Sequence, residues 1–139
     1  MHKDIGIEGL GDLVERPFVA TLATYRKNGD VLLTPVWHEF RDGGFNVVID
    51  GDDVKARNIK RDPRASFALY DNDPPYRGLE LRATPKLISE GAVATMTRIA
   101  IRYLGEADGR SYAESLDGGE VIVRLEPGDL RTWDFAGDF

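Results

Sequence analysis

Cysteine is absent from this chain of 139 residues, and histidine occurs only as His2 and His38. Without cysteine there is no disulfide, no thiolate nucleophile and no cysteine-ligated zinc or iron–sulfur site. Two histidines far apart in sequence are too few ligands for a histidine-based metal site within one chain. The acidic residues fall mostly at turns, where carboxylates are typical capping groups. We therefore expect no metal, although a carboxylate-only magnesium site stays open.

Long uncharged segments are also missing. The longest is Pro17–Tyr25, nine residues, whereas a membrane-spanning helix needs about 20 apolar residues. The N-terminus carries Asp4 and Glu8 and lacks the apolar core of a signal peptide. We therefore expect no membrane partner, no signal peptide and a cytoplasmic location.

Positive charge is in short supply, since 24 acidic residues outnumber 18 basic ones and the net charge is −6. A nucleic-acid binder needs a large basic footprint, so we expect no nucleic-acid partner. The chain also lacks a G-x-S-x-G elbow, a P-loop and a G-x-G-x-x-G fingerprint, and no catalytic nucleophile is visible. The length and the hydrophobic content of 42% are those of one ordinary domain, residues 1–139.

Strand signals dominate what is present. Asn28-Gly29 and Asp42-Gly43-Gly44 are turn signals between β-branched and aromatic segments, which predicts a β-meander. The predicted strands are Phe18–Tyr25, Val31–Phe40, Phe45–Asp50, Ala65–Asp71, Gly78–Ile88, Glu120–Glu126 and Asp129–Phe135. Six or seven mainly antiparallel strands in a small domain must hide their edges, and closure into a barrel does so. The predicted class is α+β, mainly β with helices.

Helices are predicted at four places. A short helix precedes Pro17, and a second begins at the capping residues Asp52 and Asp53 and stops at Pro63. A third begins at Ser89 and ends at Gly105, and its apolar stripe comprises Val93, Met96, Ala100, Tyr103 and Leu104. A single helical turn is expected over Ser111–Leu116.

The segment Val54–Arg64 concentrates five basic residues in an otherwise acidic protein. Lys55 and Ile59, four residues apart, share one helix face, so Lys55 is drawn inward with the apolar Ile59. A lysine beside the free N–H groups of a helix N-terminus favours anion binding. The alternative is a solvated basic face that serves solubility.

A second unusual segment is Thr34–His38, which places Pro35 inside a predicted strand. Proline cannot donate to a ladder, so this strand edge is free or bulged. An open edge beside Trp37 suits a flat heterocycle, whereas the alternative is ordinary core packing of Val36 and Trp37. For His38 we expect a structural or solvent-facing role rather than that of a base.

Together these segments resemble a known family. They are Thr21-Leu22-Ala23-Thr24, Asn28-Gly29, Thr34-Pro35-Val36-Trp37 and Lys55–Arg64, supported by Pro75-Tyr76-Arg77, Arg102–Gly105 and Thr132–Phe135. Their order resembles the pyridoxamine 5'-phosphate oxidase-like superfamily over nearly the whole chain. More narrowly, the sequence is similar to the flavin/deazaflavin oxidoreductase B group, small proteins that use coenzyme F420.

The resemblance implies a split β-barrel homodimer of the FMN-binding-protein-like kind, with the cofactor in a groove at the subunit interface. It implies that the second and third strands line the cofactor ring and that Lys55 holds the phosphate, assisted by other polar residues of its helix. Tyr76 and Arg77 follow the loop before the fifth strand and are expected to reach the ligand. The residues so implied in cofactor binding are Thr34, Pro35, Val36, Trp37, Val48, Ile49, Asp50, Lys55, Arg57, Asn58, Lys60, Arg61, Tyr76 and Arg77.

Departures from the family pattern bear on the cofactor. Leu33 and His38 stand where the pyridoxamine phosphate oxidases proper carry an arginine and a lysine for the FMN phosphate. Their arginine- and histidine-containing C-terminal substrate motif has no counterpart in Asp134–Phe139. Asp50 stands where relatives often carry a small hydroxyl residue. The first two differences favour the deazaflavin over FMN and argue against a vitamin B6 oxidase.

Three functions follow as hypotheses. The first is a coenzyme F420-dependent oxidoreductase that transfers a hydride between the deazaflavin and a conjugated small molecule. The second is an FMN-dependent oxidoreductase on the same fold. The third is a non-catalytic carrier of a flavin or a haem, against which the shortage of histidine argues. No catalytic residue stands out, so solvent or a tyrosine such as Tyr76 must supply the proton.

Overall fold

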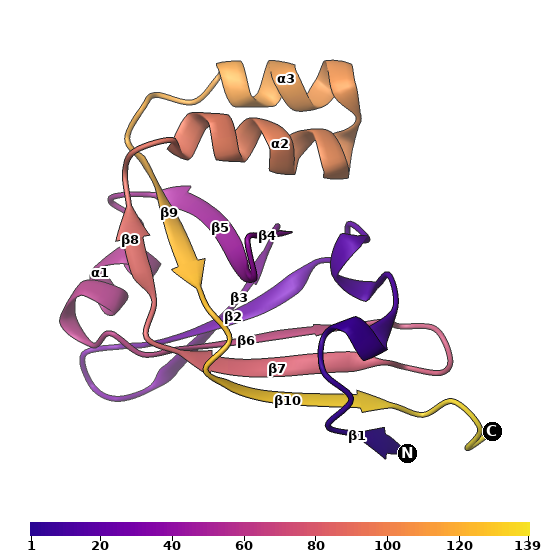
Figure 1. Cartoon of the computed structure of the whole chain (residues 1–139). Helices are drawn as coiled ribbons and strands as arrows, with labels where there is room; N and C mark the ends of the chain where they lie inside the picture. The colour runs from indigo at the N-terminus through magenta and orange to yellow at the C-terminus, as the bar shows by residue number, and fades with distance from the viewer.

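The computed structural model describes all residues 1–139, and its strands form two antiparallel sheets (Figure 1). The six-stranded sheet has the order β1 (His2–Lys3), β10 (Asp129–Asp134), β7 (Gly78–Ala83), β6 (Ala65–Tyr70), β2 (Ala20–Tyr25) and β3 (Val31–Val36). The four-stranded sheet has the order β4 (Glu39–Arg41), β5 (Gly44–Asp50), β9 (Glu120–Leu125) and β8 (Lys86–Ile88). The predicted α+β class with mainly antiparallel strands is confirmed.

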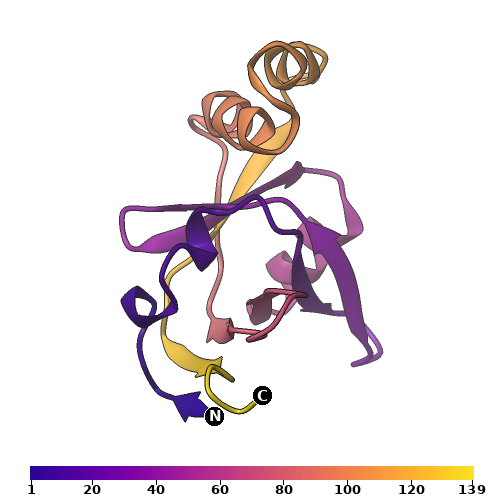
Figure 2. The ribbon, with the colours of Figure 1, turned by 90° about the vertical axis from the view of Figure 1, so that its right-hand side faces the viewer.

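Three α-helices and two 3-10 turns complete the chain: η1 (Glu8–Leu10), η2 (Leu13–Glu15), α1 (Val54–Arg61), α2 (Ala92–Leu104) and α3 (Glu106–Glu114). α2 and α3 form a helical hairpin that covers the outer side of the four-stranded sheet, and the view in Figure 2 agrees with Figure 1 on this arrangement. α1 follows β5 directly and lies on the other side of that strand from the hairpin (Figure 1). None of these helices is long and apolar enough to cross a membrane.

The main hydrophobic core lies between the two sheets, and a smaller core lies between the four-stranded sheet and α2. β5 contributes to both, because successive side chains of a strand point to opposite faces. Phe45, Val47 and Ile49 belong to the main core, whereas Val48 packs with Met96 in the smaller one. This double burial explains why β5 is an almost continuous apolar segment.

Two of the predicted strands are each divided between the sheets. The predicted strand Val31–Phe40 ends as β3 at Val36, and after Trp37 and His38 the chain enters the second sheet as β4. The predicted strand Gly78–Ile88 divides in the same way at Thr84-Pro85. The missing N–H of Pro85 fits the end of one ladder, whereas nothing in local β-propensity marks the break at Trp37.

The helix predictions need three corrections. The segment before Pro17 forms the two 3-10 turns rather than an α-helix, and glycines with positive φ, such as Gly11, interrupt it. α2 begins after Gly91 with no side-chain cap, so Ser89 does not cap it. The turn predicted over Ser111–Leu116 is the end of the nine-residue helix α3. The predicted end of α2 at Gly105 is confirmed.

β3 is an edge strand, as Pro35 predicts. Its outward-facing residues Val31, Leu33 and Pro35 are exposed, whereas Val36 is buried in the core. Val19, just before β2, is exposed as well. We call these four exposed residues, Val19, Val31, Leu33 and Pro35, the apolar edge.

Candidate functional site

An open cavity of about 380 Å³ lies where the ends of β3 and β5, the N-terminus of α1 and the helical hairpin meet. This volume falls in the range of small-molecule sites, about 300–1,000 Å³. Its lining is Val19, Pro35, Val36, Trp37, Val48, Ile49, Asp53, Lys55, Met96 and Tyr112. The surface is therefore mainly apolar, with the ion pair of Lys55 and Asp53 and one phenol.

Six of the residues implied in cofactor binding meet in this cavity: Pro35, Val36, Trp37, Val48, Ile49 and Lys55. They come from three segments that the sheet topology brings together, because β3 ends beside the cavity and α1 begins where β5 stops. The open edge of β3 and the start of α1, singled out by separate sequence signals, therefore lie at one cavity, and anion binding there stays a prediction.

Lys55 lies in the first turn of α1 with only 15% of its side chain exposed. Asp53 is the N-cap of this helix, and its carboxylate accepts a hydrogen bond of 2.8 Å from the backbone N–H of Lys55. The same carboxylate lies 3.2 Å from the Lys55 ammonium. The stem of Lys55 is thereby held along the cavity wall with its charge at the helix N-terminus, where an anion is favoured.

Trp37 forms the aromatic wall of the cavity. Its indole stacks on the ring of Tyr103, with centroids 4.9 Å apart and an interplanar angle of 9°. On another side it meets the ring of Tyr112 at 5.6 Å and 60°. The Tyr103 hydroxyl accepts a 3.1 Å hydrogen bond from the His38 N–H and donates a 2.7 Å bond to the Phe18 carbonyl. Its burial raises the pKa of Tyr103.

His38 is structural, which confirms one of the two roles expected for it. It is fully buried between the rings of Phe45, Phe67 and Tyr103, and neither ring nitrogen has a hydrogen-bond partner. Burial first, and the charge of Arg102 second, lower the pKa of His38 to about 4. The imidazole is therefore neutral near pH 7 and does not reach the cavity as a base.

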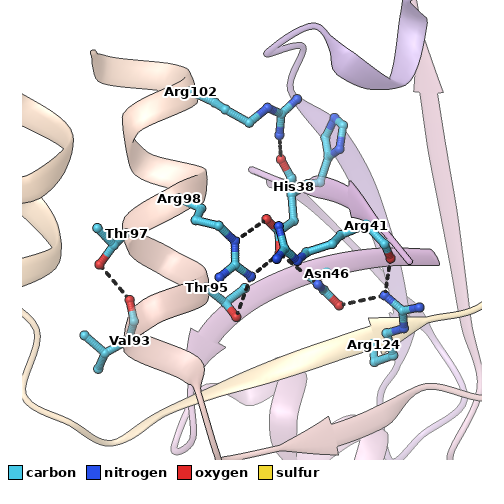
Figure 3. A network of polar contacts seen from close by, with 10 residues as sticks. His38, Arg41, Asn46, Val93, Thr95, Thr97, Arg98, Arg102 and Arg124 are labelled. Carbon is cyan, nitrogen blue, oxygen red and sulfur yellow. Dashed lines mark hydrogen bonds and ion pairs between the residues drawn. The ribbon is translucent and has the colours of Figure 1, made fainter. Parts of the chain in front are cut away.

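A polar network holds the hairpin against the four-stranded sheet (Figure 3). Arg98 of α2 donates two hydrogen bonds, 3.0 and 2.9 Å, to the buried carboxylate of Glu39 in β4. Asn46 donates a third to Glu39 at 2.8 Å, and Arg102 donates to the backbone carbonyl of His38. These charge-assisted bonds fix α2 beside the Trp37 segment, so the cavity wall is firmly supported.

A second hollow, of about 420 Å³, opens beside α1 and the β2–β3 turn. Its lining is Arg26, Lys27, Asn28, Val54, Arg57, Asn58 and Arg61, with no acidic residue. The ion pairs of this region join Lys55 to Asp53 and Arg64 to Asp62. None of the basic residues of the hollow forms an ion pair. We call this surface the basic hollow.

The four other polar residues implied for α1 have different surroundings. Asn58 is buried, donates to the Thr24 hydroxyl at 3.2 Å and accepts from Arg61 at 3.1 Å, so its amide serves the fold. Arg57 donates to the carbonyl of Asp52 at 2.6 Å and lines the basic hollow with Arg61. Lys60 is exposed and lines neither hollow.

Four further implied residues do not line the cavity of this chain. Thr34 approaches the Leu22 carbonyl at 3.5 Å, and Asp50 accepts a 2.9 Å bond from the N–H of Asp52. Arg77 donates to the Leu10 carbonyl at 2.8 Å and pairs with Asp12 at 2.7 Å. Tyr76 lies in the same β6–β7 loop, at the other end of the sheet from α1 (Figure 1). Their part in cofactor binding stays a prediction.

The sequence reasoning missed four residues of the cavity lining: Val19, Asp53, Met96 and Tyr112. The sequence pattern marks Asp53 only as a helix cap and Met96 only as part of an apolar stripe. Tyr112 carries no local signal, because its position depends on how α3 folds back on α2. Gly109 permits that close approach, since a Cβ there would lie 2.5 Å from the backbone nitrogen of Ile101.

A family model described as "Pyridoxamine 5'-phosphate oxidase" matches residues 8–134. The chain belongs to this family. The resemblance found in the sequence motifs is thereby confirmed, and with it the oxidoreductase family whose members bind flavin-type cofactors. Among curated protein sequences, none matches the chain.

Solved structures extend the family relation. The conserved hypothetical protein Rv2991 from Mycobacterium tuberculosis shares 27% identity, with a TM-score of 0.79 over 94% of this chain and 86% of that one. A protein described as an F420 reductase shares 26% identity, with a TM-score of 0.70 over 86% of this chain and 93% of its own. The heme storage protein HutZ from Vibrio cholerae, at 17% identity and a TM-score of 0.70 over 92% and 94%, shares the fold.

Proposed function

We propose that this family member is a coenzyme F420-dependent oxidoreductase that transfers a hydride between the deazaflavin and a conjugated small molecule. The observation that carries the proposal is the cavity itself, which joins the Lys55 ammonium to an apolar wall of Trp37, Val48 and Ile49. A flat ring attached to a phosphate has the same two-part chemistry. The similarity to an F420 reductase over most of both chains favours the deazaflavin.

The residues present fit such a cofactor. Lys55 and the N-terminus of α1 would hold the phosphate, and the basic hollow beside them suits further anionic groups of the same ligand. Trp37, Val48 and Ile49 would orient the ring and exclude water from it. When bound, the reduced deazaflavin supplies the hydride, and the protein supplies binding, orientation and a dry wall.

The apolar edge supports a homodimer with the cofactor at the subunit interface. Val19 and Pro35 line the cavity and are themselves exposed, and Val31 and Leu33 continue the same apolar surface along β3. Several exposed apolar side chains on an unpaired edge strand are typical of a surface that a second chain covers. In the proposed dimer, Tyr76 and Arg77 reach the ligand only from the partner copy.

The test is a parallel titration of tryptophan fluorescence with coenzyme F420 and with FMN. The chain has two tryptophans, so Trp133→Phe leaves Trp37 as the single reporter, and Trp37→Phe is the matched control. We expect F420 to bind tightly and to quench the fluorescence of Trp37. The fluorescence of the Trp37→Phe control should stay unchanged. Tight quenching by FMN alone would replace the proposal by the FMN-dependent oxidoreductase, and binding by neither ligand would overturn both.

Turnover separates the enzyme from the carrier. With reduced F420 bound, we expect hydride transfer to members of a panel of enones and quinones, followed as reoxidation of the deazaflavin. Tight F420 binding without reduction of any acceptor would support the non-catalytic carrier instead. Haem is a further titrant for that alternative, and His38 offers it no ligand because its ring is fully buried.

A further inference from the structure

The phenol of Tyr112 is a polar group of the cavity that no sequence motif predicts. Its ring lies against Trp37 at 5.6 Å, and its side chain lines the cavity. Tyr112 is 41% exposed, and its hydroxyl makes no hydrogen bond within the chain. The cavity therefore holds an accessible O–H donor beside its aromatic wall.

The position of this phenol is determined by the hairpin. α3 packs on α2 closely enough that a Cβ at Gly109 would clash with the Ile101 backbone, which sets the distance between the two helices. At the end of α3, the carbonyl of Tyr112 accepts hydrogen bonds from the N–H of Ser115 at 3.1 Å and from its hydroxyl at 2.6 Å. A ligand therefore meets Tyr112 in a fixed place rather than on a mobile loop.

The cavity has two other side chains that can donate hydrogen bonds, Lys55 and Trp37. Lys55 belongs to the anionic end and is paired with Asp53 at 3.2 Å. Apart from Tyr112, the indole N–H of Trp37 is the single neutral side-chain donor in the lining. A carbonyl oxygen that enters this mainly apolar space loses water, which is unfavourable unless a protein donor replaces it.

We propose that Tyr112 donates a hydrogen bond to the carbonyl oxygen of a planar conjugated ligand that packs against Trp37, and so selects carbonyl-bearing rings over hydrocarbons of the same shape. The inference rests on the proposed function, because it places the ligand in the same cavity. Two sources carry this chemistry: the cofactor ring itself, or a quinone or enone acceptor. The hydrogen bond is the shared element.

The experiment compares menadione with 2-methylnaphthalene, which has the same ring skeleton and methyl group without the two oxygens. Binding is followed by the indole signals of ¹⁵N-tryptophan-labelled protein, in which Trp37 reports on the cavity and Trp133, in β10, is the internal control. We expect wild type to prefer menadione. Tyr112→Phe should weaken menadione binding roughly 3–10-fold, the effect of one neutral hydrogen bond, and leave the hydrocarbon unchanged.

Tyr70→Phe is the matched control, because Tyr70 is half exposed and lines a different hollow. Tyr112→Phe removes no hydrogen bond within the chain, so its fold, checked by circular dichroism, should be that of wild type. Equal affinity of wild type and Tyr112→Phe for menadione, and also for F420 and FMN, would overturn the inference.

A second arm identifies the source of the carbonyl. If Tyr112→Phe weakens F420 or FMN binding instead of menadione binding, the oxygen belongs to the cofactor ring; if menadione binding falls in cofactor-saturated protein, it belongs to the acceptor. Cofactor binding that Tyr112→Phe leaves intact, together with unchanged menadione affinity, overturns this inference alone. If neither F420 nor FMN binds but the preference for menadione is retained, the proposed function alone is overturned.

Discussion

The indole of Trp37 lies parallel to the ring of Tyr103, with the two centroids 4.9 Å apart. The hydroxyl of the same tyrosine joins the His38 N–H to the Phe18 carbonyl, at 3.1 and 2.7 Å. One side chain of α2 therefore supports both the face of the indole and the backbone that carries it. This explains how Trp37 keeps a defined orientation although it lies between two strands of different sheets.

Removing only the hydroxyl tests this relationship. Tyr103→Phe keeps the stacked ring but leaves the His38 N–H and the Phe18 carbonyl without their partner. Such a loss costs about 1–3 kcal/mol of the free energy of unfolding. We expect this loss in urea unfolding, with Tyr70→Phe as a control because Tyr70 is exposed. Equal stability of the two variants would show that water replaces the Tyr103 hydroxyl.

The ion pair between Glu39 and Arg98 gives a second prediction. Burial alone would raise the pKa of Glu39, but the hydrogen bonds from Arg98 and Asn46 outweigh it and lower the pKa. Arg98 is 39% exposed and can turn to water, so we expect Glu39→Ala to cost about 1–3 kcal/mol. A double-mutant cycle with Arg98→Met should show coupling of about 0.5–3 kcal/mol, and strict additivity would contradict it.

Much of the site could be predicted because its signals are local. The apolar Ile59 four residues after Lys55 indicates which way the lysine points, and Pro35 marks an edge strand; both are seen in the structure. Hairpin chemistry at Asn28-Gly29 likewise predicts that β2 pairs with β3. Each of these inferences needs only the properties of neighbouring residues.

The rest depends on packing between distant segments. The segment Val31–Phe40 divides between two sheets because both sheets pack around the core residues Phe45 and Phe67. No local sequence pattern predicts this division. Tyr112 and Trp37 lie 75 positions apart in sequence and meet only because α3 folds onto α2. The polar sequence of α3 with its central Gly109 is a weak helix former, so tertiary contacts decide its extent.

His38 predicts a pH dependence of stability. Its pKa is about 4 in the folded protein and ordinarily 6.5, so between these values the unfolded chain binds the proton and the folded chain does not. The free energy of unfolding should therefore fall as the pH drops from 6.5 to 4, by about 1.4 kcal/mol per unit. Carboxylates such as Glu39, whose pKa is lowered, lose their contribution at lower pH.

The variant His38→Leu isolates this effect. The buried ring nitrogens have no partner, so an apolar side chain of similar size should be tolerated. Urea unfolding at several pH values should give a steep decline for wild type between pH 6.5 and 4.5 and a much flatter curve for His38→Leu. Parallel curves would show that the histidine is protonated in the folded protein.

The proposed homodimer predicts a mass of about twice 15.5 kDa in light scattering. Leu33 is 63% exposed at the centre of the apolar edge. Leu33→Glu should cost an isolated subunit little but place a charge in the interface, and so yield monomers. Leu104→Glu, which adds the same charge on α2, should remain a dimer. A monomeric wild type, or a dimer unaffected by Leu33→Glu, would contradict this use of the edge.

Substitutions of Lys55 and of Asp53 should change the affinity for the cofactor in opposite directions. Lys55→Met removes a charged hydrogen bond to the phosphate, worth about 1.5–3 kcal/mol, so the affinity for F420 or FMN should fall roughly 10–150-fold. Lys86→Met, which removes the same charge from an exposed position on β8, is the control. Fluorescence titration in the Trp133→Phe background measures the affinity of both variants. Equal affinities of Lys55→Met and Lys86→Met would show that Lys55 does not bind the phosphate.

Asp53→Asn sharpens this test because it separates the charge of Asp53 from its capping role. Asparagine caps a helix N-terminus about as well as aspartate, so α1 should keep its stability. The substitution removes the carboxylate that lies 3.2 Å from the Lys55 ammonium, which leaves the lysine free for the phosphate. We expect tighter cofactor binding at low salt, with the gain reduced as salt screens the charges. Weaker binding in Asp53→Asn would instead show that this carboxylate positions Lys55 for the ligand.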